Sequence, residues 1–259
     1  MSQPSWILSV VNQKGGVGKT TTAVNLSAGL AASGEATLLV DADPQANATS
    51  GLGIEAFDFT LFELFQGEVS VDKAILETGR PYLYLIPAGV DLTGIDVLFA
   101  SQIARETVLR RILQPLREHF RWIIIDTPPS LGLLTVNALT TSDGLIIPLQ
   151  CEYYALEGLT QLMRTVELVR QHLNPQLEMW KVLLTMYDMR TRLAEQVEAE
   201  VRKFFGAKVA HTVIPRNVRI GESPSFGQPV IEYDPRSRGA QAYLEFVKEV
   251  QAYGASRIR

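Results

Sequence analysis

The sequence has little of what marks a secreted, metal-chelating or membrane-spanning protein. Its 259 residues contain one cysteine, Cys151, so no intramolecular disulfide framework can form and a reducing, cytoplasmic setting is expected. The three histidines lie far apart and lack metal-ligand spacing. The N-terminus lacks the basic and apolar regions of a signal peptide, and no run of about 18 apolar residues predicts a transmembrane helix.

The chain also has no excess of positive charge. Its 24 Lys and Arg residues face 28 Asp and Glu residues, a net charge of −4, so any nucleic-acid binding must come from a local patch. The apolar fraction of 46% is enough for a sizeable core. We see no internal repeat and no low-complexity linker, and therefore expect residues 1–259 to form a single domain.

Short β-prone runs alternate with helical patterns along the chain. The predicted strands are rich in Val, Ile and Leu and cover residues 6–11, 36–41, 82–87, 121–126, 144–149, 180–185 and 208–213. The predicted helices lie between them, at 20–32, 105–118, 156–172, 191–205 and 239–253. Continuous apolar strands such as 121–126 are typical of a parallel sheet buried on both faces. The pattern therefore predicts an α/β fold with a doubly wound, mostly parallel sheet flanked by helices.

A glycine-rich run joins the first predicted strand to the first predicted helix. It reads Lys14-Gly15-Gly16-Val17-Gly18-Lys19-Thr20-Thr21. This context is that of a phosphate-binding loop, in which backbone N–H groups and the helix N-terminus hold a phosphate chain. We expect Lys19 to reach the β- and γ-phosphates of ATP, Thr20 to bind Mg²⁺, and Thr21 to bind a phosphate.

The loop departs from the general G-x-x-x-x-G-K-[ST] pattern at two positions. Gln13 stands where the first glycine belongs, and a second lysine, Lys14, lies inside the loop. A second cation beside the phosphates needs an anion to pair with. Lys14 is either a solvated surface residue or a group that contacts a phosphate across a dimer, as an arginine finger does in trans.

Acidic residues end two of the predicted apolar strands, where ligands bind in an open α/β sheet. Asp126 ends one strand and is the predicted Mg²⁺ ligand, through water. Asp43 follows another strand and is the candidate for orienting the attacking water, because phosphoryl transfer needs placement more than a strong base. Asp41 could equally be a structural turn residue.

The sequence resembles the ParA/Soj family of chromosome- and plasmid-partitioning ATPases, within the wider group that includes MinD and the nitrogenase iron protein. The matching motifs span nearly the whole chain, at residues 12–21, 41–45, 123–130, 150–158, 214–220 and 233–240. No additional N-terminal helix-turn-helix domain is visible.

The resemblance implies an ATP-driven cycle. ATP and Mg²⁺ produce a sandwich homodimer in which Lys14 reaches the partner subunit's nucleotide, the dimer binds double-stranded DNA without sequence preference, and a ParB-like protein stimulates hydrolysis. Lys19, Thr20 and Asp43 would serve the nucleotide. Pro215 and Asn217 match the segment beside the adenine, and Glu152 matches a position that can face the nucleotide across the dimer. The implied location is cytoplasmic and nucleoid-associated, with no membrane partner.

One part of the sequence is locally basic. Residues 181–219 hold eight Lys or Arg and four Asp or Glu, a net charge of +4 against −8 for the rest of the chain. The resemblance makes Arg190 and Arg219 the leading DNA-binding candidates. Four further candidates are Arg192, Arg202, Lys203 and Arg216. A mixed, solvated helix face is the alternative for those four, because glutamates lie among them.

Two other functions remain to be separated from partitioning. A MinD-like membrane-associated positioning ATPase would carry a basic amphipathic C-terminal helix, whereas residues 239–253 include Glu245 and Glu249 and favour packing against the sheet. A cluster carrier like the nitrogenase iron protein needs more thiolates than two copies of Cys151 supply. A metabolic P-loop enzyme lacks any visible second-substrate motif.

Overall fold

One eight-stranded sheet organises the computed structural model, which describes residues 5–152 and 155–257. The strands are β1 (Trp6–Val10), β2 (Thr37–Asp41), β3 (Leu76–Glu77), β4 (Leu83–Ile86), β5 (Trp122–Asp126), β6 (Gly144–Gln150), β7 (Glu178–Tyr187) and β8 (Val209–Pro215). Their order across the sheet is β3-β4-β2-β5-β1-β6-β7-β8. Every pairing is parallel except that of the short β3 with β4. The predicted doubly wound, mostly parallel α/β sheet is therefore confirmed.

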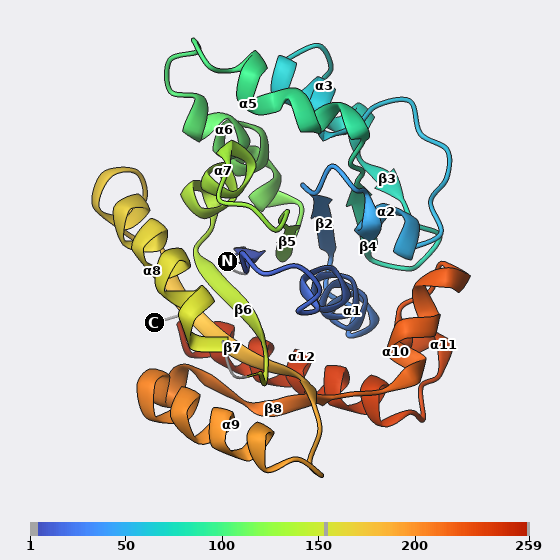
Figure 1. The fold of residues 1–259 in the computed structure, drawn as a ribbon. Coiled ribbons are helices and arrows are strands. Elements are labelled where there is room, and N and C mark those ends of the chain that lie inside the picture. Colours follow the sequence, from blue (N-terminus) through green and yellow to red (C-terminus); the bar gives the residue numbers. More distant parts are fainter. Residues whose placement is uncertain (1–4, 153–154, 258–259) are drawn as a thin grey trace.

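Helices cover both faces of this sheet (Figure 1). The longer ones are α1 (Lys19–Ala32), α7 (Leu133–Thr141), α8 (Ala155–His172), α9 (Arg192–Phe205) and α12 (Arg238–Ser256). The shorter ones are α2 (Asn47–Gly51), α3 (Leu61–Gln66), α4 (Val71–Ala74), α5 (Ile95–Leu98), α6 (Val108–Leu113), α10 (Val218–Glu222) and α11 (Val230–Tyr233). Among the described residues, no helix combines the length and apolar character needed to cross a bilayer.

Alternate residues of the central strands belong to separate hydrophobic cores, one on each face of the sheet. Leu8 of β1 and Ile124 of β5 pack with α1 and α12 on one face, whereas Ile123 and Ile125 pack with α6 and α7 on the other. Strands buried on both faces are apolar at nearly every position, which is why these strands lack the polar–apolar alternation of a half-exposed sheet. The C-terminal α12 buries Tyr243, as expected of a helix that packs on the sheet.

The predicted helix at 105–118 is wrong in part. It is broken into a 3₁₀ turn, α6, and a second 3₁₀ turn over Gln114–Glu118. Pro115 is the second residue of that turn, and a proline lacks the N–H that would continue the α-helical ladder. The sequence interpretation also missed α7, because its Leu-, Thr- and Ala-rich run is buried on almost every side and has no amphipathic period.

A largely buried ion pair fastens α12 to β7, and hydrogen bonds fasten it to the edge strand β8. Lys181 of β7 contacts the Glu249 carboxylate at 2.8 Å, and Glu249 also accepts hydrogen bonds from the backbone N–H groups of His211 and Thr212. Burial alone would raise the pKa of Glu249, but these hydrogen bonds and the ammonium group lower it below its ordinary value. Lys181 therefore belongs to the interior, although the sequence interpretation counted it in the basic surface.

Candidate functional site

The phosphate loop lies between the end of β1 and the start of α1. Gly16 and Gly18 have φ angles of 73° and 89°, a left-handed conformation that side chains rarely tolerate, and this explains their place in the motif. The Thr185 hydroxyl donates to the Val17 carbonyl at 2.8 Å, and the Asn12 side chain accepts from the Lys14 N–H at 3.0 Å. The loop is therefore held in shape by β7 as well as by its own residues.

The register of the sheet places the carboxyl ends of β2, β5 and β1 side by side. Asp41 of β2 pairs with Asp126 of β5, and Asp126 pairs with Val10, after which the phosphate loop begins. Lys19, the first residue of α1, is 6% exposed and donates its ammonium to the Lys14 carbonyl at 3.1 Å. Burial lowers the pKa of Lys19, while the negative charges of Asp126 and Asp43 oppose the shift.

Asp126 is a fully buried carboxylate at the end of β5. Neither of its oxygen atoms has a hydrogen-bond partner within the described residues, and both are inaccessible to solvent. Burial raises the pKa of Asp126 well above its ordinary value and Asp41 adds to the rise, whereas the nearby Thr20 hydroxyl and Lys19 oppose it. A buried, unpaired carboxylate beside a helix N-terminus and a threonine hydroxyl has the chemistry that Mg²⁺ binding requires, so these residues fit that ion.

Asp41 accepts hydrogen bonds from the loop and the helix that follow β2. One carboxylate oxygen accepts from the N–H and the hydroxyl of Thr49, each at 2.8 Å, and the other accepts from the Asp43 N–H at 3.1 Å. Burial raises the pKa of Asp41 to about 6, and the Thr49 hydrogen bonds oppose the rise. Of the two readings that the sequence allowed, these contacts favour the structural one.

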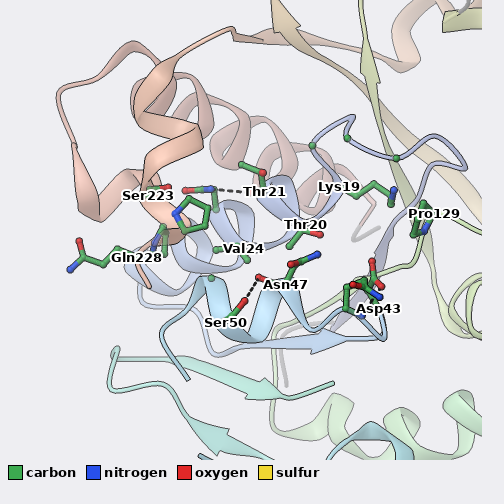
Figure 2. A pocket seen from close by; sticks show the side chains of 18 of the residues that line it. Lys19, Thr20, Thr21, Val24, Asp43, Asn47, Ser50, Pro129, Ser223 and Gln228 are labelled. Carbon is green, nitrogen blue, oxygen red and sulfur yellow. Dashed lines mark hydrogen bonds between the residues drawn. The ribbon is translucent and has the colours of Figure 1, made fainter. Parts of the chain in front are cut away.

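A cavity of about 430 Å³ opens beside the phosphate loop (Figure 2). Lys19, Asp43 and Pro129 lie at one end, and Ser223 and Gln228 lie at the other. Between them α1 and α2 form a wall of the cavity, and the lining residues there are Thr20, Thr21, Val24, Asn25, Asn47, Ser50 and Gly51. The Asp43 side chain is buried and accepts from the Gln45 N–H at 3.0 Å, so its loop is fixed with the carboxylate facing the cavity.

Most of the predicted phosphate-binding residues meet at this cavity. Its lining includes Gly15, Gly16, Gly18, Lys19, Thr20 and Thr21, together with Asp43. Val17 of the same loop is buried beneath it. Asp126 lies at the adjacent strand end, where its negative charge opposes the lowering of the Lys19 pKa by burial.

Four predicted nucleotide contacts lie outside the lining that the described residues form. Lys14 and Glu152 pair with each other within the chain at 2.5 Å, and both side chains are close to half-exposed. Asn217 caps α10 by accepting from the Arg219 N–H at 2.8 Å, and Pro215 ends β8 just before it. Tyr153 and Tyr154, within the motif at 150–158, fall outside the described residues.

Sequence reasoning missed the far wall of the cavity. This wall consists of Met186, which follows Thr185 on β7, and of four residues between α10 and α11: Ser223, Pro224, Gln228 and Pro229. The two prolines in a short polar segment were the available signal, because such a segment forms a rigid surface turn. The segment lies directly downstream of the predicted adenine-side residues.

The predicted DNA-binding residues are exposed but mostly carry partners. Arg190 has a side chain 86% exposed and pairs with Asp188 at 2.8 Å, which holds the pKa of that carboxyl near 2. Arg219 contacts Glu222 at 2.8 Å and Asp234 at 3.3 Å. These surface pairs are weak and can exchange for a phosphate.

The four weaker candidates divide into two kinds. Arg192, Lys203 and Arg216 are exposed. Arg202 is only partly exposed, pairs with Glu198 at 2.7 Å and donates to the Ala210 carbonyl, so it is mainly structural. Lys208, counted in the basic segment, contacts the Tyr253 hydroxyl at 3.0 Å. The surface of this segment is therefore less basic than its composition indicates.

The loop, the row of strand ends and the cavity define a P-loop ATPase site. A family model described as an AAA domain matches residues 5–179. The chain is 55% identical to the sporulation initiation inhibitor protein Soj of Bacillus subtilis over 96% of this chain and 99% of that protein. It is 51% identical to the chromosome partitioning protein ParA of Caulobacter vibrioides over 96% and 95%. The chain belongs to the ParA/Soj family of P-loop ATPases.

Solved structures give the same fold with other roles. The structure matches cobyrinic acid a,c-diamide synthase from Mycobacterium smegmatis with bound ADP and magnesium, with a TM-score of 0.86, 36% identity, and coverage of 97% of this chain and 96% of that one. It matches the cell division ATPase MinD of Pyrococcus furiosus with a TM-score of 0.80, 29% identity, and coverage of 96% and 99%. Fold alone therefore does not select among these functions.

Proposed function

We propose that this protein is an ATP-dependent chromosome- or plasmid-partitioning ATPase, with residues 1–259 acting as one domain in the cytoplasm. The observation that carries the proposal is the cavity of about 430 Å³ lined by the phosphate loop and Asp43, in a chain about half identical to proteins named for chromosome partitioning. In this proposal the protein associates with the nucleoid, and a ParB-like protein stimulates hydrolysis.

The residues of the cavity have distinct roles in ATP hydrolysis. The loop N–H groups from Gly15 to Thr21 and the Lys19 ammonium bind the phosphate chain and neutralise its charge. Thr20 and Asp126 would hold Mg²⁺, which when bound neutralises developing charge on the phosphate oxygens. Asp43, held by the Gln45 N–H, orients the attacking water.

The second lysine connects hydrolysis with dimerisation. Lys14 reaches the partner subunit's phosphate in the ATP-bound sandwich dimer, and this requires it to leave Glu152 of its own chain. Because that pair is nearly half-exposed, it is worth no more than about 1 kcal/mol and exchanges readily. In the dimer Glu152 would face the nucleotide across the interface, and Pro215 and Asn217 would lie beside the adenine.

DNA binding would use exposed basic residues on α9, on α10 and on the loops before these two helices. Arg190 and Arg219 are the principal phosphate contacts, with Arg192, Lys203 and Arg216 beside them and Arg202 as a structural support. A single subunit offers few phosphate contacts. Pairing two subunits doubles them, which gives a physical reason for DNA binding that depends on ATP.

The test is DNA binding by the purified protein at one fixed, near-physiological salt concentration, with ATP, with ADP and without nucleotide. Arg190→Ala and Arg219→Ala are measured in parallel. Arg111→Ala is the matched control, because Arg111 is an exposed arginine on α6, outside the basic segment. We expect binding with ATP only, weakened at least about threefold in the first two variants and unchanged in the control.

Two outcomes would contradict the proposal. Intact ATPase activity without DNA binding in any nucleotide state rejects partitioning through DNA. ATP-dependent sedimentation with anionic lipid vesicles in the same experiment would instead favour a MinD-like positioning ATPase.

A further inference from the structure

Arg80 occupies an unusual place in the turn between β3 and β4. Its side chain is 18% exposed, and all three nitrogen atoms of its guanidinium donate hydrogen bonds. The Nε group donates to both Glu232 oxygens at 3.0 and 2.8 Å. One terminal nitrogen donates to the Leu52 carbonyl at 2.9 Å and the other to the Gly227 carbonyl at 2.9 Å. A planar guanidinium can satisfy three such acceptors at once, which an ammonium cannot do with the same geometry.

The two carbonyls belong to two adjoining walls of the ATP cavity. Leu52 directly follows α2, which contributes Asn47, Ser50 and Gly51 to the lining. Gly227 precedes Gln228 and Pro229 of the far wall. In Figure 1, α2, α10 and α11 lie on the same side of the molecule. Arg80 therefore joins two cavity walls that come from distant parts of the sequence.

Backbone contact between the same two walls leaves no space for a side chain. A Cβ atom on Gly227 would lie 2.6 Å from the Cα atom of Gly53, and one on Gly53 would lie 3.2 Å from the Gly227 carbonyl oxygen. Both glycines have positive φ angles, of 77° at Gly53 and 62° at Gly227. The two walls meet at this glycine contact, and Arg80 spans it from outside the cavity.

We propose that Arg80 is a positioning residue of the ATP site, which fixes the distance between the α2 wall and the far wall by bonding to both. It touches neither the reacting atoms nor the lining of the cavity. Glu232 orients the guanidinium through the two Nε contacts. The inference rests on the ATP site proposed above.

The direct test compares ATP affinity and steady-state hydrolysis in Arg80→Ala, Arg80→Lys and Glu232→Gln. Arg117→Ala is the matched control, because Arg117 is 21% exposed and also bonds a carboxylate, Asp143, and a backbone carbonyl, that of Ser5. These two partners directly precede β1 and β6, at the amino ends of the strands, whereas the cavity lies at the carboxyl ends. Affinity is measured directly with a fluorescent ATP analogue, and folding is measured by thermal unfolding.

We expect Arg80→Ala to weaken ATP affinity and raise KM about tenfold while kcat changes less than about threefold, because the walls that bind the nucleotide separate but the reacting groups stay in place. Arg80→Lys and Glu232→Gln should give intermediate losses. Arg117→Ala should lower thermal stability comparably and leave ATP affinity unchanged.

An equal change of ATP affinity in Arg80→Ala and Arg117→Ala would overturn the inference, as would a folded Arg80→Ala protein with normal affinity. Should Arg80→Ala fail to fold, unchanged affinity in both Arg80→Lys and Glu232→Gln would overturn it as well. Absence of ATP binding by the unsubstituted protein would instead reject the ATP site itself, so the two failures are distinguishable.

Discussion

The two ends of the ATP cavity are encoded in different ways. The phosphate end comes from one continuous run, residues 14–21, with Asp43 and Asp126 at neighbouring strand ends. The opposite wall combines Met186 with residues between α10 and α11, and its position depends on Arg80 from a third segment. A local motif therefore fixes the chemistry at one end, whereas tertiary packing alone fixes the shape at the other.

The largest effect is expected at the phosphate end. Lys19→Ala removes the buried ammonium that neutralises phosphate charge, and we expect ATP hydrolysis to fall at least about 100-fold. Steady-state phosphate release measures the loss. Lys248→Ala is a suitable control, because Lys248 is exposed on α12 and pairs only weakly with Glu245. Retention of more than about a tenth of the activity in Lys19→Ala would show that this end does not dominate the chemistry.

A second substitution separates chemistry from binding at the same end. Asp43→Asn keeps the oxygen that accepts from the Gln45 N–H but removes the charge that orients water, so kcat should fall about 100-fold. ATP affinity should change less than about threefold, because the walls stay in place. Single-turnover hydrolysis measures the chemical step, and a direct binding measurement gives the ATP affinity. A loss of affinity as large as the loss of kcat would contradict the assigned role.

The smallest effect is expected at the far wall. Gln228→Ala removes one exposed side chain from the lining, and KM for ATP should rise only about two- to fivefold with kcat unchanged. Gln176→Ala, an exposed glutamine in the loop before β7, serves as the control. A change in kcat without a change in KM would mean that this wall acts on the chemistry rather than on binding.

The same contrast explains what could be predicted from the sequence. The buried strands and the phosphate loop follow from patterns within a few residues, so their existence was predicted correctly. The helix at 105–118 was predicted too long because the apolar period continues through Pro115 although the helix does not. The burial of Lys181 was not predictable, because it depends on Glu249 arriving from α12. The lining by Pro224 and Pro229 likewise depends on how α10 and α11 pack.

The stretch from α10 to α11 has a thermodynamic consequence. It carries Arg219 at its start and the far wall of the cavity at Ser223, Pro224, Gln228 and Pro229. If nucleotide binding shifts this wall, it therefore also shifts the helix that carries Arg219, the proposed DNA contact. Coupling of this kind is reciprocal, since the factor by which ATP tightens DNA binding must equal the factor by which DNA tightens ATP binding. DNA would then act as an effector of nucleotide affinity, and not only as the surface on which the protein resides.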